Sequence, residues 1–251
     1  MIPLHTSTTP EKDAAHALNS HLDEHRNEDI LLLFSGGSAL SLLPYVDTSA
    51  LGERCTVTVL DERYTADPTA SNMAALVADP FFERARKQHV AVIDPRPEGD
   101  ESLARAAKRF DIALKHWHIL HHDGIVIATM GIGPDGHTSG VLPRPENPET
   151  FAKLFLDPHM CVCGYRIPNG SSPHPERMTT TLSYIQRHVH HAVVYATGES
   201  KREVLDRVFD AHGSLAETPA RILRELPDVR LYADITLGED AGTSVENATR
   251  T

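Results

Sequence analysis

Short runs of apolar residues recur along the chain, and each run ends in small or polar residues. Such continuous runs are typical of strands in a parallel sheet, because those strands are covered on both faces. One further segment, near residue 180, is rich in threonine, which favours an extended backbone. The pattern predicts strands or extended segments at 30–34, 56–60, 89–93, 124–130, 160–165, 177–182, 192–196 and 230–233.

Polar segments with apolar residues at helical spacing lie between these runs. The clearest is 101–120, where Leu103, Phe110 and Leu114 belong to one apolar stripe. Three prolines at 143, 145 and 148 indicate an irregular surface segment after the fourth strand. The spacing predicts helices at 11–26, 39–43, 71–77, 101–120, 199–209 and 219–226.

Alternation of strands and helices predicts the fold class. Strands that alternate with helices form a mainly parallel sheet with helices on both faces, so we predict an α/β fold. The chain has 251 residues, 40% of them hydrophobic, which is enough for one core. Because it shows no flexible linker, repeat or charge block, we expect a single domain over 1–251, with a polar tail that frays from about residue 238.

Charge and cysteine content limit the partners and the compartment. The formal charge is −11, from 24 basic and 35 acidic side chains, which argues against a nucleic-acid or anionic-membrane surface. A few cations gathered in one pocket could still bind a small anion. We expect a cytoplasmic protein, because there is no secretory signal, no apolar run near ~18 residues, and no well-placed cysteine pair in Cys55, Cys161 and Cys163.

The chain has 16 histidines, which raises the question of a metal site. They gather in two groups, at 116–122 and at 188–191. Neither group has the accompanying ligands or the spacing of a known site type. We therefore interpret both groups as solvated surface and expect no metal.

The most distinctive segment is the loop Gly131–Gly140, which follows the predicted strand 124–130 and contains four glycines. Glycines allow positive φ and let a ligand approach the backbone. Open α/β sheets bind ligands at the carboxyl ends of their strands, where this loop lies. Asp135 and His137 lie two residues apart in it, so His137 is a candidate general base. The alternative is a glycine turn that happens to contain a histidine.

Two more predicted strands end in residues that suit chemistry. Ser35-Gly36-Gly37-Ser38 offers hydroxyls and backbone amides at a helix start, which suits a phosphate, although Gly-Gly turns are also common. It lacks the lysine of a nucleotide-binding P-loop and the glycine spacing of a dinucleotide fold. Asp61-Glu62-Arg63 follows the second strand. From this tripeptide alone, a functional cluster and a surface ion pair are equally plausible.

Two other cations are candidates for binding an anion. Lys201 follows Gly198 and falls in the first turn of a predicted helix, where a cation opposes the helix dipole. An anion between the helix start and the ammonium would resolve that conflict, and an exposed lysine is the alternative. Arg177 begins the threonine-rich stretch, either as a site residue or as a surface arginine.

Taken in order, these motifs resemble the family of 6-phosphogluconolactonases and glucosamine-6-phosphate deaminases. The long glycine loop is the most specific of them, and the Ser-Gly-Gly loop the least. Matching segments cover most of the chain between residues 30 and 205, namely 35–38, 61–63, 71–72, 131–143, 177–182 and 198–201.

The resemblance implies a Rossmann-like α/β fold, a sugar-6-phosphate substrate, no metal and no redox cofactor. It implies that His137 is the catalytic base, with Asp61, Arg63 and Asp135 close by. The expected phosphate contacts are Ser38, Arg177 and Lys201, together with Gly36 and Gly37 of the first loop. A small phosphorylated sugar lactone is thus the expected partner.

Two features favour the lactonases within that family. The deaminases carry a catalytic glutamate five residues after the histidine, where this chain has Leu142, and an aromatic residue where it has Arg63. There are also departures from the lactonases. The first loop continues Ala39-Leu40 instead of Thr-Pro, and the long loop ends Ser139-Gly140 instead of Ala-Ser, which leaves the fine substrate preference open.

The expected reaction is hydrolysis of 6-phospho-D-glucono-1,5-lactone, a step of the oxidative pentose phosphate pathway. His137 would take a proton from the attacking water. Arg63 or loop amides near Gly36 would stabilise the oxyanion. Asp135 would either orient the imidazole or bind a sugar hydroxyl. Two alternatives are a deaminase or isomerase, in which Asp61 abstracts a proton, and a sugar-phosphate sensor without catalysis.

Overall fold

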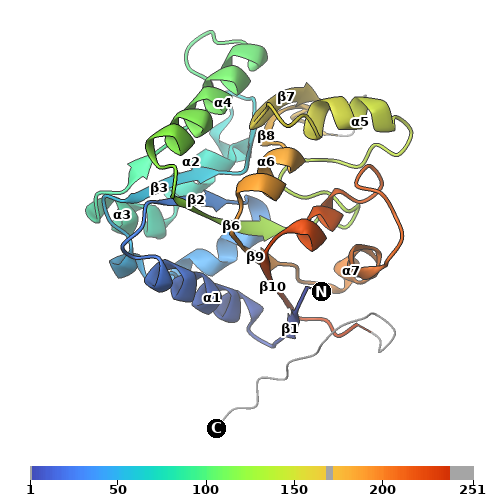
Figure 1. Cartoon of the computed structure of the whole chain (residues 1–251), viewed down its shortest axis with the longest axis horizontal. Coiled ribbons are helices and arrows are strands. Elements are labelled where there is room, and N and C mark those ends of the chain that lie inside the picture. Colours follow the sequence, from blue (N-terminus) through green and yellow to red (C-terminus); the bar gives the residue numbers. More distant parts are fainter. Residues whose placement is uncertain (1, 168–171, 238–251) are drawn as a thin grey trace.

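The computed structural model describes residues 2–167 and 172–237, and within them the chain forms a central sheet of seven parallel strands (Figure 1). Going across the sheet, the order is β1-β10-β9-β6-β2-β3-β5. After β2 the chain adds β3 and β5 on one side, and then it returns to place β6 on the other side of β2. The strands are β1 (Leu4–Thr6), β2 (Ile30–Phe34), β3 (Cys55–Val59), β5 (Ala91–Val92), β6 (Ile125–Gly131), β9 (His191–Tyr195) and β10 (Asp228–Ala233).

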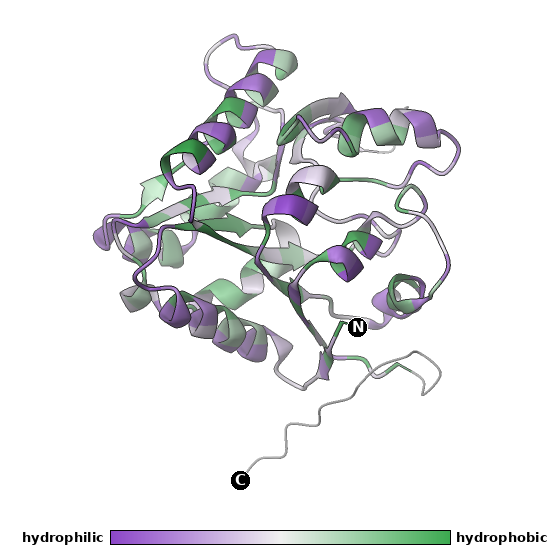
Figure 2. Ribbon diagram, viewed as in Figure 1, coloured by the Kyte–Doolittle hydropathy of each residue, from purple (hydrophilic) through white to green (hydrophobic). Residues whose placement is uncertain are grey.

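Helices cover both faces of this sheet, and β2 shows why. Its side chains alternate between two cores: Leu31 and Leu33 belong to one, and Ile30, Leu32 and Phe34 to the other. Apolar side chains on both faces need cover on both sides, and Figure 2 shows the hydrophobic sheet between helices with mixed surfaces. The first core includes α4 (Leu103–Leu120), α6 (Leu182–His188), α7 (Arg202–Phe209) and the 3₁₀ helix η5 (Pro219–Glu225). The second includes α1 (Pro10–Glu24), η1 (Gly37–Tyr45), α2 (Asn72–Ala78) and α3 (Pro80–Lys87).

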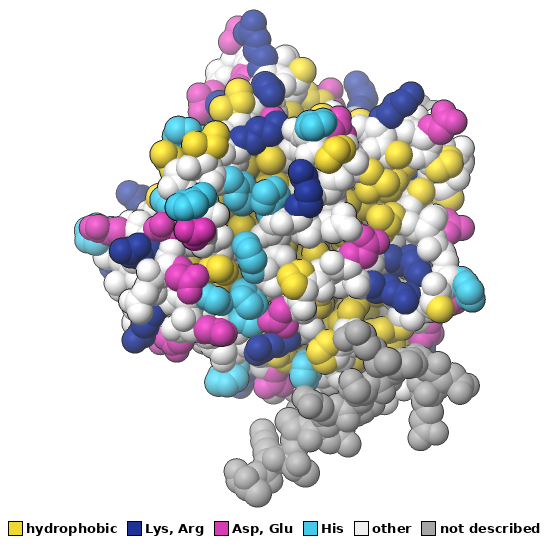
Figure 3. Space-filling model, in the orientation of Figure 1, with side chains coloured by type: hydrophobic (Ala, Val, Ile, Leu, Met, Phe, Trp, Pro, Cys, Tyr) yellow, Lys and Arg dark blue, Asp and Glu magenta, His cyan; other side chains and the backbone are white. Residues whose placement is uncertain are grey.

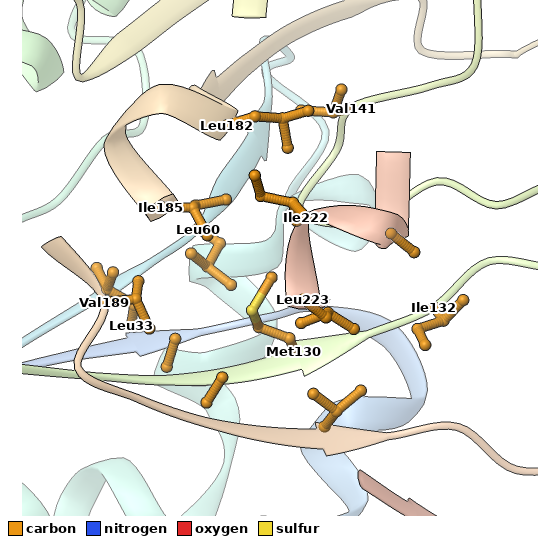
Figure 4. Close-up of a cluster of buried hydrophobic side chains, with 14 of the residues drawn as sticks. Leu33, Leu60, Met130, Ile132, Val141, Leu182, Ile185, Val189, Ile222 and Leu223 are labelled. Atoms are coloured by element: carbon orange, nitrogen blue, oxygen red, sulfur yellow. The ribbon is translucent and has the colours of Figure 1, made fainter. Parts of the chain in front are cut away.

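A second sheet of three antiparallel strands lies on the α4 side, in the order β4-β8-β7. Its strands are β4 (Asp61–Arg63), β7 (Val162–Arg166) and β8 (Glu176–Thr180). Its strand β7 approaches α4 closely, since a Cβ on Gly164 would lie 2.9 Å from Cβ of Ala107. Both sheets contribute to the α4-side core, where Figure 4 shows Leu33, Leu60 and Met130 near side chains of η5.

The predicted α/β class, with a mainly parallel sheet and helices on both faces, is confirmed. The small antiparallel sheet was not predicted, nor were β1 and α3. The extended segment predicted at 177–182 is wrong at its end, because β8 stops at Thr180 and α6 begins at Leu182. Thr181 caps that helix by accepting a hydrogen bond from Tyr184 N at 3.0 Å.

The segment around Pro148 was also misinterpreted. It starts the helix α5 (Pro148–Phe155), with Asn147 as the capping residue and Pro148 in the first turn. Proline fits the first turn of a helix because no backbone amide is needed there. Three short 3₁₀ turns complete the secondary structure of the described residues: η2 (Thr48–Ala50), η3 (Pro68–Ala70) and η4 (Glu199–Lys201). The predicted polar tail from 238 lies outside the described residues.

The cysteines and helices bear on two of the sequence expectations. Cys55, Cys161 and Cys163 are all buried and free. Burial raises the pKa of Cys161 to about 11 and that of Cys163 to about 12, so both thiols are protonated at neutral pH. In 2–167 and 172–237, no helix has both the length and the apolar character needed to cross a membrane.

One buried carboxylate holds α4 to the second sheet. Asp111 is 3% exposed, and its Oδ1 accepts hydrogen bonds from the backbone amides of Cys161 at 2.8 Å and Val162 at 3.3 Å. Its Oδ2 lies 2.9 Å from Lys115 Nζ and 3.1 Å from Lys108 Nζ. Burial alone would raise the pKa of Asp111, but the hydrogen bonds from Lys115 and Cys161 outweigh it, and the pKa is lowered.

We expect Asp111→Ala to lower the free energy of unfolding by about 1–3 kcal/mol, because two buried amides lose their acceptor. Urea unfolding measures this change, with the exposed Asp123→Ala as the matched control. The carboxyl pKa is lower in the folded state than in the unfolded state. Its stabilisation is therefore complete above the unfolded pKa and is lost as the pH falls through the folded one. Equal midpoints for the two variants at neutral pH would contradict this role.

Candidate active site

A pocket of about 350 Å³ opens at the carboxyl ends of the main-sheet strands, beside β2 and β6. The strand order reverses between these neighbours, so the loops that follow them diverge and leave a crevice. The second sheet and η4 supply the remaining walls. All nine site residues predicted from the sequence line this pocket: Gly36, Gly37, Ser38, Asp61, Arg63, Asp135, His137, Arg177 and Lys201.

The loop after β6 presents an imidazole held by a carboxylate. His137 Nδ1 lies 2.6 Å from Asp135 Oδ1, and the same oxygen accepts the His137 backbone amide at 3.1 Å. Gly133 lies against the ring, where a Cβ would be 2.0 Å from His137 Nδ1. Burial alone would raise the pKa of Asp135. The hydrogen bond to the imidazole outweighs that effect, and the pKa of Asp135 is lowered. Asp135 is therefore an ionised acceptor that fixes the ring.

The end of the same loop is anchored against the second sheet. Gly140 has a φ of +72°, and a Cβ there would lie 2.6 Å from Cβ of Asp61. Tyr165 donates a hydrogen bond to the Gly140 carbonyl at 2.5 Å, and Thr179 donates one to the Ser139 carbonyl. The loop consequently reaches the pocket only because residue 140 has no side chain.

The tripeptide Asp61-Glu62-Arg63 forms strand β4, in which successive side chains point to opposite faces. Asp61 and Arg63 line the pocket, whereas Glu62 points the other way and is fully buried. Glu62 accepts hydrogen bonds at 2.8 Å from the Ser71 hydroxyl and from the backbone amides of Asn72 and Met73. Interpreting this segment as a surface ion pair is therefore wrong, because Glu62 fixes β4 to the start of α2.

Two guanidinium groups lie side by side in the pocket wall. Arg63 of β4 is paired in register with Arg177 of β8, and both line the pocket. The Nε atoms of both are buried without a hydrogen-bond partner. Burial, followed by repulsion from Arg63, lowers the pKa of Arg177. Donors of this kind suit an anion, and Arg177 is not a simple surface arginine.

Asp61 is the acidic neighbour of this cationic pair. It is 6% exposed, and burial raises its pKa, while attraction to Arg63, Arg177 and His137 acts in the opposite direction. Asn72 donates a hydrogen bond from Nδ2 to the Asp61 carbonyl at 2.9 Å. A buried carboxyl near two guanidiniums partly balances their charge.

The remaining walls come from the first loop and η4. Gly36 precedes η1, whose first amides have no side-chain cap, and a Cβ on Gly36 would lie 2.1 Å from Asn72 Oδ1. Lys201 ends η4, directly before α7. Burial lowers the pKa of Lys201, and attraction to Asp135 partly offsets that effect. A half-buried ammonium facing the pocket differs from the exposed lysine that the sequence left as an alternative.

Comparison with known proteins supports one family for this chain. Residues 6–230 match the profile of the glucosamine-6-phosphate isomerases/6-phosphogluconolactonase family. The chain belongs to this family.

Several relatives and solved structures agree with that assignment. The chain is 27% identical over 212 residues to a 6-phosphogluconolactonase of Neisseria meningitidis, covering 83% of this chain and 85% of that protein. It is 27% identical over 185 residues to the human 6-phosphogluconolactonase, covering 70% and 67%. The crystal structure of a 6-phosphogluconolactonase from Shewanella baltica has a TM-score of 0.72 at 21% identity, covering 93% of this chain and 97% of that one.

Several pocket residues of this family member were not predicted as site residues. Asn72 and Ser172 line the pocket, and Ser172 accepts a hydrogen bond from Arg177 Nη2 at 3.2 Å. Asn72 falls in one of the segments that carry the family resemblance, so that signal was present in the sequence. Ser172 lies in a polar loop without periodicity and gave none. Residues 168–171 of that loop are outside the described part.

The surface interpretation of the histidine groups is partly wrong. His116, His122 and His190 are exposed, as expected. His118 and His188 instead stack at a ring-centroid distance of 4.2 Å, and His118 lies 3.1 Å from the Tyr184 hydroxyl. Burial lowers the pKa of His118 to about 4, so this pair is neutral packing at the end of α4.

We expect Gly140→Ala to lower the free energy of unfolding by about 1–3 kcal/mol, because a side chain at positive φ is strained and its Cβ overlaps Asp61. Thermal and urea unfolding measure this loss. Gly52→Ala is the matched control, since a Cβ there meets no atom within 4 Å. Equal unfolding midpoints for the two variants would show that the loop can shift away from Asp61.

Proposed function

We propose that the chain hydrolyses 6-phospho-D-glucono-1,5-lactone to 6-phosphogluconate, with His137 as the general base. The observation that carries the proposal is the 2.6 Å contact between Asp135 and His137 in a pocket that also holds three cationic side chains. Family membership supports the same reaction class. The proposal requires neither a metal nor a redox cofactor, because water, a base and a stabilised oxyanion suffice for ester hydrolysis.

The contact with Asp135 determines which ring nitrogen can accept a proton. A carboxylate only accepts hydrogen bonds, so Nδ1 of His137 carries the hydrogen and Nε2 keeps its lone pair. We infer that Nε2 takes a proton from water while the water oxygen bonds to C1 of the lactone. The protonated Nε2 then delivers that proton to the ring oxygen as the C1–O bond breaks, which leaves the open-chain acid. In this mechanism Asp135 orients the imidazole.

The cations divide between the developing oxyanion and the phosphate. We infer that Arg63 stabilises the carbonyl oxygen as it becomes negative, with amides near Gly36 as the alternative donors. Arg177, Lys201 and the Gly36–Ser38 loop would bind the phosphate. Their half-buried side chains and uncapped amides favour an anion that replaces water. Because the phosphate is remote from C1, its binding positions the lactone for attack.

The deaminase and sensor alternatives make different use of the same pocket. The deaminases carry a catalytic glutamate five residues after the histidine, and the corresponding position here is Leu142, which lines the pocket. A sensor needs the phosphate contacts but not the Asp135–His137 pair. The pocket has that pair and has Leu142 in place of the deaminase glutamate, which favours the lactonase.

Turnover of freshly prepared 6-phosphogluconolactone, with spontaneous hydrolysis subtracted, tests the proposal directly. Ammonia release from glucosamine 6-phosphate is measured in parallel. Saturable lactone hydrolysis without ammonia supports the lactonase. Saturable ammonia release would replace it with the deaminase, and binding of the sugar phosphates without turnover would replace it with the sensor.

We expect His137→Gln to lower kcat by about 10²–10⁴-fold, because glutamine can hydrogen-bond to water but cannot accept its proton. The KM for the lactone should change little, and the melting temperature should stay the same. His122→Gln, an exposed histidine outside the pocket, is the control. If the glutamine variant keeps most of its background-corrected kcat, then His137 is not the base and Asp61 becomes the next candidate.

We expect Lys201→Ala to raise the KM for the phosphorylated lactone about 10- to 150-fold, because a charge-assisted contact of ~1.5–3 kcal/mol is lost. The kcat should fall far less. Hydrolysis of unphosphorylated glucono-1,5-lactone should be equal in the variant and the wild type. Lys153→Ala, an exposed lysine on α5, controls for the general loss of one positive charge. An unchanged KM would remove Lys201 from the phosphate site.

A further inference from the structure

A second cluster of ionisable side chains lies at the amino ends of the main-sheet strands, whereas the pocket lies at their carboxyl ends. His191 begins β9, Asp228 begins β10, and the two residues are paired in register. His21 and His25 reach them from the last turn of α1 and the residue after it. Figure 3 shows histidine side chains gathered on this face with acidic side chains beside them. No residue of this cluster lines the candidate active site.

The contacts in this cluster require more hydrogens than neutral imidazoles carry. His25 Nδ1 lies 3.1 Å from Glu28 Oε1, and His25 Nε2 lies 2.9 Å from His191 Nε2. His191 Nδ1 lies 2.7 Å from Asp228 Oδ2. These are three short contacts, and each needs one hydrogen, but two neutral imidazoles have one ring hydrogen each. One contact therefore needs an additional proton or another cation.

One assignment of the ring hydrogens places the missing cation beside Asp228, where His21 also lies. If His25 donates to Glu28 and His191 donates to His25, then Nδ1 of His191 has no hydrogen. Its lone pair then faces the carboxylate of Asp228. A lone pair and a carboxylate oxygen at 2.7 Å repel one another unless a cation lies between them or beside them.

His21 supplies an independent observation at the same place. Its side chain is 1% exposed, yet both ring nitrogens lack a hydrogen-bond partner. Its Nε2 lies 3.6 Å from Asp228 Oδ2, and its ring stacks on His191 at a centroid distance of 4.2 Å. Burial, with smaller effects of His191 and Arg230, lowers the pKa of His21 to about 4. A buried imidazole whose ring nitrogens have no hydrogen-bond partner is a donor of the kind that binds metals.

We propose that His21 Nε2, His191 Nδ1 and Asp228 Oδ2 bind a divalent transition-metal ion of the zinc class. Each of these three residues offers a ligand atom that lies within 4.8 Å of those of the other two. In tetrahedral coordination with bonds of ~2.0–2.1 Å, neighbouring ligand atoms are about 3.3 Å apart. The contacts of 2.7 Å and 3.6 Å to Asp228 Oδ2 bracket that spacing, and the stacked rings of His21 and His191 would tilt apart so that a nitrogen of each faces the ion. A fourth position is left for water.

His25 has a supporting role in this site. It accepts the Nε2 hydrogen of His191 and so leaves Nδ1 free for the metal, as an outer hydrogen-bond partner commonly does. Its other nitrogen contacts Glu28 at 3.1 Å. Arg230 opposes the ion electrostatically, while Asp228, Glu24 and Glu28 favour it. These acids supply negative charge of the kind that a divalent ion requires.

The metal would be structural, because it joins α1 to the amino ends of β9 and β10, away from the pocket. The expectation of no metal rested on the ligands and spacing along the sequence and on the family resemblance. That spacing could not reveal this group, whose ligands come from three separate segments. The proposal is independent of the reaction assigned to the pocket.

Isothermal titration of the chelator-treated protein with Zn²⁺ at pH 7.5 tests the site, and Co²⁺ serves as a spectroscopic probe. We expect one ion per chain, a rise in melting temperature, and the intense visible absorption of four-coordinate Co²⁺. The variants Asp228→Asn and His191→Gln should lose this stoichiometric binding. His25→Gln should weaken it about 10- to 100-fold. His16→Gln, an exposed histidine on the same helix, should bind like the wild type.

The controls separate a built site from general histidine binding. Circular dichroism without metal verifies that each variant is folded. If Asp228→Asn or His191→Gln does not fold, His25→Gln decides, because it changes only the outer partner. Absence of stoichiometric binding by the wild type would overturn the proposal and leave an extra proton in the cluster. Binding of several ions that is equally strong in His16→Gln and the cluster variants would also overturn it.

Discussion

Leu60 is the residue through which the two sheets are joined. Its amide donates to the Phe34 carbonyl of β2 at 2.9 Å, and its carbonyl accepts from the amide of Thr180, the last residue of β8, at 2.8 Å. The side chain of Leu60 is fully buried in the core that the two sheets share. Asp61 and Arg63 follow directly in β4. The two hydrogen bonds of Leu60 therefore fix where these side chains lie relative to the carboxyl ends of the main-sheet strands.

The electrostatics of the pocket follow from that placement. Arg63 and Arg177 are opposite each other in an antiparallel pair, an arrangement that is unfavourable for two like charges. The buried carboxyl of Asp61 partly offsets their repulsion. On the opposite face of β4, Glu62 fixes the strand through its hydrogen bonds to the start of α2. An anionic ligand would complete the balance. A chain with a net charge of −11 can therefore still present a cationic cavity.

How much the sequence could predict depends on the range of the interactions involved. The buried strands and the glycine loop are local signals, because apolar runs and glycines act through neighbouring residues. The second sheet depends on a long-range interaction, since β4 pairs with β8, which is more distant in the sequence. Its strand β4 is also too short and too polar to be recognised by its pattern. For this reason the sequence identified Asp61 and Arg63 as candidates but not the strand that aims both of them at the pocket.

The histidine cluster illustrates the same limit with a different outcome. His21 looks like any polar residue on an amphipathic helix, and only the fold shows that it is buried against β9. Between the cluster and the pocket, β9 is hydrogen-bonded to β6 on one side and β10 on the other. Ala192, Val193 and Val194 are almost completely buried, so this strand cannot shift without breaking both ladders. A cation at the amino ends of β9 and β10 would thus stabilise the packing of α1 on the sheet. The geometry of the pocket at the carboxyl ends of the strands would stay the same.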